Sequence, residues 1–65
     1  MCEQNAYIIK QDKEQLIMES VELVEPEGAD SWRIVDLFGD QKVLKGRLRK
    51  MNLVEHKILF EALDD

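Results

Sequence analysis

Short apolar runs, separated by polar or turn-forming segments, recur along the chain and constrain its fold more than any other feature. The runs are rich in β-branched and aromatic residues, as at residues 7–9 and 32–35. Several of them alternate with a period of two, which is typical of a strand that buries one face. Turn signals follow at close spacing, and together these patterns predict an all-β domain.

Individual strands can be assigned from these runs. One buried strand face is expected to consist of Leu16, Met18, Val21 and Leu23. Pro26 and Gly28 mark the clearest loop. A half-buried strand is predicted after this loop from the alternation of Trp32, Ile34 and Leu37. It is expected to end in a two-residue hairpin at Gly39-Asp40.

The segment from residue 47 to residue 63 contains many good helix formers, but its alternation favours a hairpin. Met51 begins one arm, Phe60 lies in the other, and Glu55-His56 is expected to form the turn between them. The parity of the apolar positions slips between Leu48 and Met51, which predicts a β-bulge or a join between a loop and a strand.

The shortness of the chain limits its architecture to one domain, residues 1–65. A domain of this size buries only about 60% of the surface that its unfolded chain exposes. A single cysteine excludes an internal disulfide, so a metal ion or a second subunit is expected to add stability. About six or seven short strands predict a curled sheet or an SH3-sized barrel, and we expect it to be homodimeric.

The charge distribution restricts the possible partners. The net charge is −5, with eight acidic and two basic residues in positions 1–30 and six acidic and seven basic residues in positions 31–65. Overall acidity opposes binding to nucleic acid. A basic stretch at residues 42–50 keeps an RNA-binding alternative open, in which the contacts come from Lys45, Arg47, Arg49 and Lys50. The only Trp, the only Tyr and the two Phe all lie in apolar strand contexts, which does not favour base stacking.

The start of the chain lacks the basic and apolar regions of a signal peptide, and no apolar run approaches the ~20 residues that span a bilayer. We therefore expect a soluble, cytoplasmic protein without a membrane partner. No catalytic constellation is evident, so we do not expect an enzyme. Cys2 and His56 would form a nucleophile and base only if the fold brought them together, and His56 is better explained as a turn residue.

Cys2 is the only cysteine, and it directly follows the initiator methionine. Removal of Met1 would give Cys2 a free α-amine beside its thiol, and the backbone amide of Glu3 could add a third donor. Mixed nitrogen and thiolate ligation in a square plane suits Ni(II) or Cu(II). Two such chain starts could meet on a dimer axis. The alternative, which chemistry alone favours, is a small apolar residue on the face of Ala6 and Ile8.

Four segments carry a resemblance that covers nearly the whole chain: MC at the start, LIMESVELVEPEG (16–28), IVDLFGDQKVLKGRL (34–48) and MNLVEHKILFE (51–61). Their order and spacing resemble the small CooT-type family, known as carbon monoxide dehydrogenase accessory proteins and otherwise as predicted RNA-binding proteins.

The resemblance implies a homodimeric small β-barrel that binds nickel through the cysteine after the initiator methionine. It further implies a role in nickel supply to carbon monoxide dehydrogenase, so the expected partners are a nickel enzyme or its maturation factors. Cys2 carries over as the ligand, and His56 is a secondary candidate. We expect Ni(II), one ion per dimer.

Overall fold

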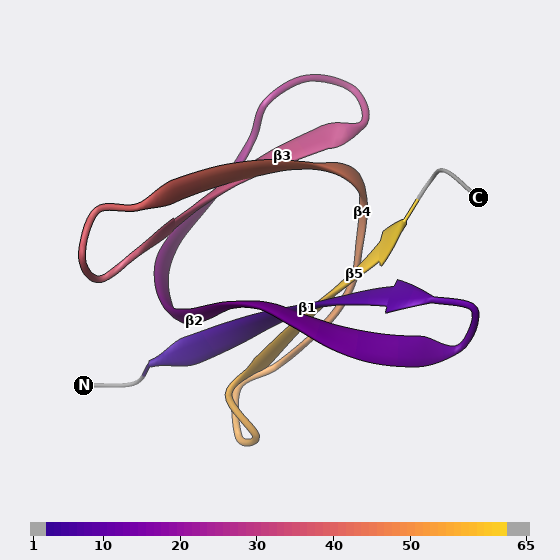
Figure 1. Ribbon diagram of the computed structural model, residues 1–65, viewed down its shortest axis with the longest axis horizontal. Coiled ribbons are helices and arrows are strands. Elements are labelled where there is room, and N and C mark those ends of the chain that lie inside the picture. Colours follow the sequence, from indigo (N-terminus) through magenta and orange to yellow (C-terminus); the bar gives the residue numbers. More distant parts are fainter. Residues whose placement is uncertain (1–2, 63–65) are drawn as a thin grey trace.

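Five strands follow one another along the chain in the computed structural model, which describes residues 3–62 (Figure 1). They are β1 (Gln4–Lys10), β2 (Lys13–Pro26), β3 (Ser31–Asp36), β4 (Gln41–Asn52) and β5 (Lys57–Ala62). The prediction of an all-β fold is therefore confirmed. Within residues 3–62 there is no helix with the length and apolar character needed to cross a membrane.

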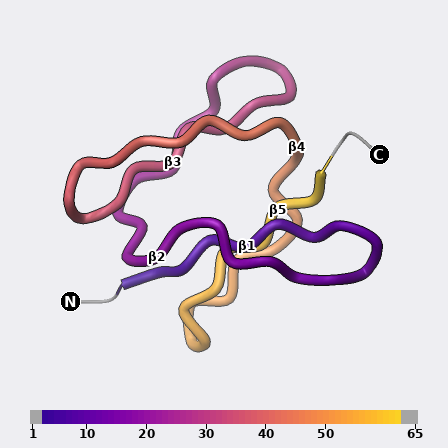
Figure 2. The backbone as a smooth tube through the Cα atoms, viewed as in Figure 1, coloured from indigo at the N-terminus to yellow at the C-terminus, as the bar shows by residue number. Residues whose placement is uncertain are grey.

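The five strands close into a ring in the order β1-β2-β3-β4-β5. Consecutive strands pair antiparallel, and the parallel pairing of β1 with β5 closes the ring. Figure 2 shows that the first and last strands consequently lie together, although they come from opposite ends of the chain. Closure leaves most strand edges paired, which limits unwanted association through them.

The prediction of six or seven short strands is wrong, because two of the strands are long and bent. β2 has 14 residues and β4 has 12. The first half of β4 pairs with β3 and the second half with β5, so one strand fills places that the sequence pattern assigned to two. A register shift between Leu48 and Lys50 confirms the predicted bulge in this strand.

The connection between β3 and β4 is longer than the predicted two-residue hairpin at Gly39-Asp40. Residues 37–40 form the turn, and Asp36 organises it from the end of β3. One oxygen of the Asp36 carboxylate accepts hydrogen bonds from the backbone N–H groups of Phe38 and Asp40, at 2.9 Å each. The Asp side chain thus satisfies turn amides that a two-residue hairpin would not contain.

The core lies inside the ring and is formed by Ala6, Val21, Ile34, Leu44, Ile58 and Phe60. Half-buried Trp32 packs against this cluster, with its ring centroid 5.9 Å from that of Phe60, which confirms the core interpretation of the tryptophan. The predicted buried face of β2 is only partly correct, since Leu16 and Leu23 are 45% and 39% exposed.

The error in β2 has a physical cause in its bulges. Register shifts interrupt both the β1–β2 and the β2–β3 pairings, and each one moves the following side chains to the other face. Ile17 and Val24 therefore pack against the core beside the correctly predicted Met18, whereas the expected period of two placed Leu16 and Leu23 there.

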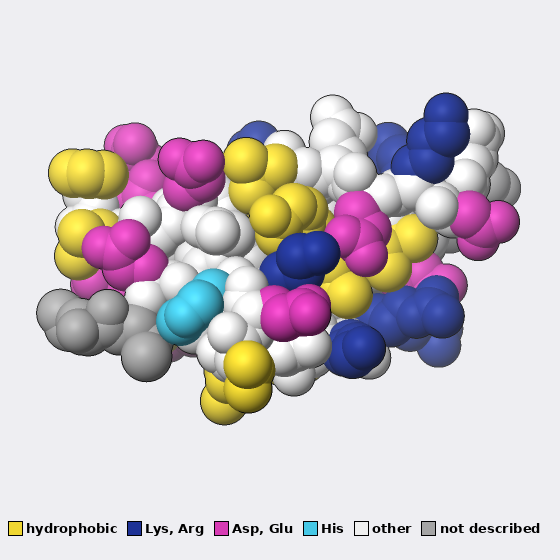
Figure 3. Space-filling view, turned by 90° about the horizontal axis from the view of Figure 1, so that it is seen from below, with side chains coloured by type: hydrophobic (Ala, Val, Ile, Leu, Met, Phe, Trp, Pro, Cys, Tyr) yellow, Lys and Arg dark blue, Asp and Glu magenta, His cyan; other side chains and the backbone are white. Residues whose placement is uncertain are grey.

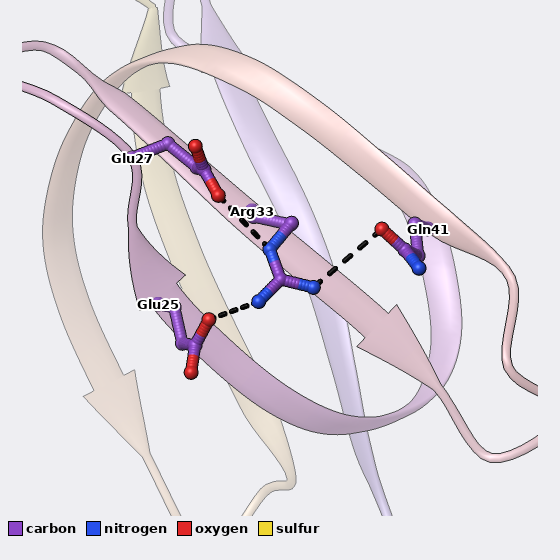
Figure 4. A network of polar contacts seen from close by, with 4 residues as sticks. All are labelled: Glu25, Glu27, Arg33 and Gln41. Atoms are coloured by element: carbon purple, nitrogen blue, oxygen red, sulfur yellow. Dashed lines mark hydrogen bonds and ion pairs between the residues drawn. The ribbon is translucent and has the colours of Figure 1, made fainter.

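The outer face of β3 carries a polar network around Arg33 (Figure 4). Its guanidinium donates to the carboxylates of Glu25 and Glu27, with the Glu27 contact at 3.0 Å, and to the side-chain oxygen of Gln41 at 3.5 Å. These contacts connect β2, the following loop, β3 and β4. Because the network is partly exposed, we expect it to stabilise the fold only modestly.

Candidate functional site

Of the three predicted metal donors, Glu3 and His56 lie within the described residues. Cys2 lies outside the described residues, so its role as a ligand stays a prediction. Glu3 is exposed immediately before β1, and its carboxylate accepts a hydrogen bond from the Ser20 hydroxyl at 3.4 Å. This contact connects the chain start to the bend of β2.

His56 is the last residue of the turn between β4 and β5 and has a positive φ of 59°. Its carbonyl oxygen accepts a hydrogen bond from the backbone N–H of Asn5 at 2.9 Å. The expectation that His56 is a turn residue is confirmed. Histidine adopts this left-handed conformation more readily than β-branched residues do.

The side chain of His56 meets Gln4, which is 52 positions away in the sequence. Gln4 Nε2 lies 3.4 Å from His56 Nδ1. The parallel register that pairs Asn5 with Lys57 causes this approach, because it places the residues that precede this pair, Gln4 and His56, side by side. His56 and the chain start, predicted as separate candidate donors, are thus neighbours in the fold.

Gln4 was not recognised from the sequence, and no local pattern identifies it. Its Oε1 is buried and has no hydrogen-bond partner among residues 3–62. As placed, the amide donates to Nδ1, so the imidazole proton would be on Nε2. If the Gln4 amide were rotated by half a turn, its Oε1 would accept a hydrogen bond from Nδ1 of His56. The Nε2 atom of His56 would then be free as an acceptor or a metal ligand. The orientation of the Gln4 amide and the tautomer of His56 are therefore coupled.

Acidic side chains are numerous but do not converge on one point. Within the described part of the chain, no three His, Asp or Glu side chains lie close enough together to hold a metal ion. The carboxylates along β2 and the following loop are mainly exposed to solvent.

The residues of the RNA-binding alternative all lie on β4 and are exposed: Lys45, Arg47, Arg49 and Lys50. Arg49 forms an ion pair with Glu61 of β5 at 3.2 Å, and Arg47 is the register partner of the same glutamate. Figure 3 likewise shows basic and acidic side chains interspersed on one face of the molecule. This mixing weakens the field that a phosphate backbone would meet.

The aromatic residues only partly match expectation. Phe60 is fully buried, Trp32 packs on it, and the Tyr7 ring is covered by the Lys57 ammonium at 5.4 Å from its centroid. The expectation that all four aromatics lie in apolar strand contexts is wrong for Phe38, which is 81% exposed in the β3–β4 turn. Asp36 caps this turn through backbone amides and leaves the phenyl ring in solvent.

The class that residues 3–62 define is that of a small all-β protein whose five strands close into a ring. The family model described as "CO dehydrogenase accessory protein CooT" matches residues 1–61. The chain therefore belongs to the CooT family. The description of this family is that of an accessory protein, not of a catalyst.

Two relatives resemble the chain over nearly its whole length. A crystal structure from Carboxydothermus hydrogenoformans, described as a candidate CooT, superposes with a TM-score of 0.86 at 36% identity and covers 97% of this chain and 100% of that chain. The uncharacterised protein MJ1551 of Methanocaldococcus jannaschii is 41% identical over 62 residues, which are 95% of this chain and 100% of the relative. The likeness thus extends over whole chains.

Proposed function

We propose that this chain is a nickel-binding accessory protein that carries Ni(II) as cargo for CO dehydrogenase or its maturation factors. Membership of a family described as accessory to CO dehydrogenase supports the client. The observation that carries the metal proposal is the position of the only cysteine, directly behind the initiator methionine.

The donor chemistry depends on removal of Met1. Once Met1 is gone, the α-amine and the thiolate of Cys2 form a five-membered chelate, and the Glu3 amide nitrogen offers a further donor. An amine releases its proton to a metal near neutral pH far more readily than an amide does. Nitrogen and thiolate donors in a square plane suit Ni(II). The retained methionine would replace this amine by an amide.

The position of His56 supports a metal site at the end of the molecule where β1 begins. Gln4, which contacts His56, is two residues from Cys2, a span of about 7 Å in an extended chain. We propose one Ni(II) per two chains, with the thiolates of two Cys2 residues as the main ligands. His56 is the secondary donor of this proposal.

Native mass spectrometry with and without Ni(II) tests the proposal on three proteins: the processed chain, a chain that retains Met1, and Cys2→Ser. The processed chain is expected to bind one Ni(II) per two chains, with a thiolate-to-metal absorption band and release of protons. Cys2→Ser should lose both signals. The Met1-retaining chain should bind much more weakly, because its easiest nitrogen donor is absent.

Lys50→Ala serves as the matched control, since this exposed side chain lies on β4 and does not belong to the proposed site. It should bind Ni(II) like the unmodified chain. Equal Ni(II) affinity of the processed, unprocessed and Cys2→Ser proteins would contradict the proposal and leave His56 as the donor to examine.

RNA binding is the second candidate function, and the row of exposed basic residues on β4 is the observation that favours it. It ranks below nickel binding because Arg49 is paired with Glu61 and three of the four aromatic rings are engaged within the fold. A single-strand binder requires exposed rings beside its basic groove.

A further inference from the structure

The first half of β2 has one backbone edge that no other described strand covers. β1 pairs with β2 from Lys13 to Val21, whereas β3 pairs with it only from Val21 to Pro26. The reason is length, since β3 has six residues and β2 has 14. Successive backbone N–H and C=O groups of a strand point alternately to its two sides. The edge before Val21 therefore offers donors and acceptors to an additional strand.

A hollow of about 480 Å3 lies beside this edge. Residues 16–20 of β2 form one wall, and Asp36, Phe38 and residues 40–42 form the other. The backbone N–H of Leu37 donates to the carbonyl of Ser20 at 2.8 Å, where the β3–β4 turn meets β2. The uncovered edge thus borders a groove, which we call the β2 groove, rather than a flat surface.

Apolar and acidic side chains line the β2 groove. Phe38 is 81% exposed and Leu16 is 45% exposed, so both present large apolar surfaces to a ligand. Glu19 and Asp40 add exposed carboxylates, and among residues 3–62 Lys42 is the one basic side chain in the lining. Figure 3 shows hydrophobic and acidic side chains next to one another at one end of the molecule.

We infer that the β2 groove binds an extended, lysine- or arginine-containing segment of a partner protein, which adds a strand to the edge of β2. Main-chain hydrogen bonds provide affinity in this recognition mode, and alternate side chains provide specificity. About four residues, or roughly 13 Å of strand, would span residues 16–19, because the Ser20 carbonyl already accepts the N–H of Leu37. Alternating apolar residues would contact Phe38 and Leu16, and the basic residues would meet the carboxylates.

Charge complementarity favours such a partner over a second copy of this chain. The copy carries a net charge of −5, and a symmetric contact between two β2 edges would bring the same carboxylates together. Like charges facing each other across an interface lower its affinity. This inference does not depend on nickel, and its test is performed without metal.

The probe is a nine-residue peptide of alternating valine and lysine, blocked at both ends, titrated into the isotopically labelled full chain. We expect amide chemical-shift changes confined to residues 13–20 and 36–42. A matched peptide of alternating valine and glutamate should have an affinity at least about tenfold lower. Two further peptides test the backbone contacts, one N-methylated at the odd-numbered residues and one at the even-numbered residues. Alternate N–H groups of a strand point to opposite sides, so only one of the two peptides loses the N–H groups that face β2, and that peptide should bind more weakly.

Variants assign the side-chain contacts. Phe38→Ala should weaken binding of the basic peptide about fivefold or more, because it removes the apolar anchor. Val43→Ala is the matched control, since this exposed residue lies outside the groove lining, and it should leave the affinity unchanged. Combined Glu19→Lys and Asp40→Lys should reverse the preference towards the acidic peptide. Unchanged spectra of the free variants would show that the fold persists.

Three results would overturn the inference. The first is equal affinity for the basic and the acidic peptide, and the second is equal binding of both N-methylated peptides. The third is dilution-dependent shifts of residues 13–20 in the absence of peptide, which would show that a second copy of the chain occupies the edge.

Discussion

Among residues 3–62, four residues other than glycine have a positive φ: Gln11 (52°), Asp12 (64°), Ser20 (57°) and His56 (59°). Gln11 and Asp12 form the two-residue connection of β1 and β2, where a type I′ turn requires this conformation twice. Ser20 lies within β2, and its N–H donates to Asn5 Oδ1 at 3.3 Å. At Ser20 and His56, polar contacts with Asn5 thus accompany the departure from regular strand geometry.

Substitutions at His56 separate the conformational role of this residue from a role in metal binding. Asn tolerates positive φ, so His56→Asn is expected to leave the free energy of unfolding nearly unchanged. His56→Val should lower it by about 1–2 kcal/mol, because a β-branched side chain is strained in the left-handed region. Urea unfolding followed by tryptophan fluorescence measures both values. Equal stability of the two variants would contradict the conformational argument.

The folded His56→Asn variant also tests the secondary donor. We expect it to bind Ni(II) less than tenfold more weakly than the parent chain (about 1.4 kcal/mol). Cys2→Ser, in contrast, should abolish binding. A complete loss of Ni(II) binding in His56→Asn would make the imidazole a principal ligand and contradict the dominance of Cys2.

At the level of strands, local alternation was sufficient to predict the class of fold, the strand around Ile34 and the bulge after Leu48. It failed where bulges shift the pattern, as at Ser20, and where a side chain such as Asp36 enlarges a turn. The local pattern also could not predict the contact of Gln4 with His56, because this contact depends on parallel pairing between β1 and β5. Long-range closure leaves no periodic signal in either strand.

Gly46 is expected to be required for the close approach of β4 to β5. A Cβ atom at this position would lie 2.4 Å from the backbone oxygen of Glu61, which cannot move without disturbing the pairing. Gly46→Ala should therefore lower the free energy of unfolding by roughly 1–3 kcal/mol, as overpacking does. Lys45→Ala, next to it on an exposed position, should change stability by less than about 0.5 kcal/mol. Similar denaturation midpoints for both variants would refute the requirement.

The basic side chains of β4 should bind RNA weakly if they form only a solvated surface. Fluorescence anisotropy with a single-stranded RNA is expected to show binding at low salt that disappears at moderate salt, because cations compete for the phosphates. Arg47→Ala combined with Arg49→Ala should reduce this low-salt signal. Tight binding that persists at physiological salt and is lost in the double variant would favour the RNA-binding function instead.

For the whole molecule, much large apolar surface stays outside the core. Seven hydrophobic residues are buried in the described part of the chain, whereas eight large ones are exposed. The exposed ones are Leu16, Leu23, Leu37, Phe38, Val43, Met51, Leu53 and Val54. A chain this short gains little stability from its own core, and covering part of this surface with a second subunit would add to it.

We therefore expect the metal-free protein to be a homodimer at high micromolar concentration. Light scattering should give twice the mass of the chain, and the midpoint of urea unfolding should rise with protein concentration, because association stabilises the folded state by mass action. Cys2→Ser should form the same dimer, since apolar contacts rather than a bridging metal hold it together. A monomer at these concentrations, with an unfolding midpoint that does not depend on concentration, would contradict the expectation and also the proposed binding of one Ni(II) between two chains.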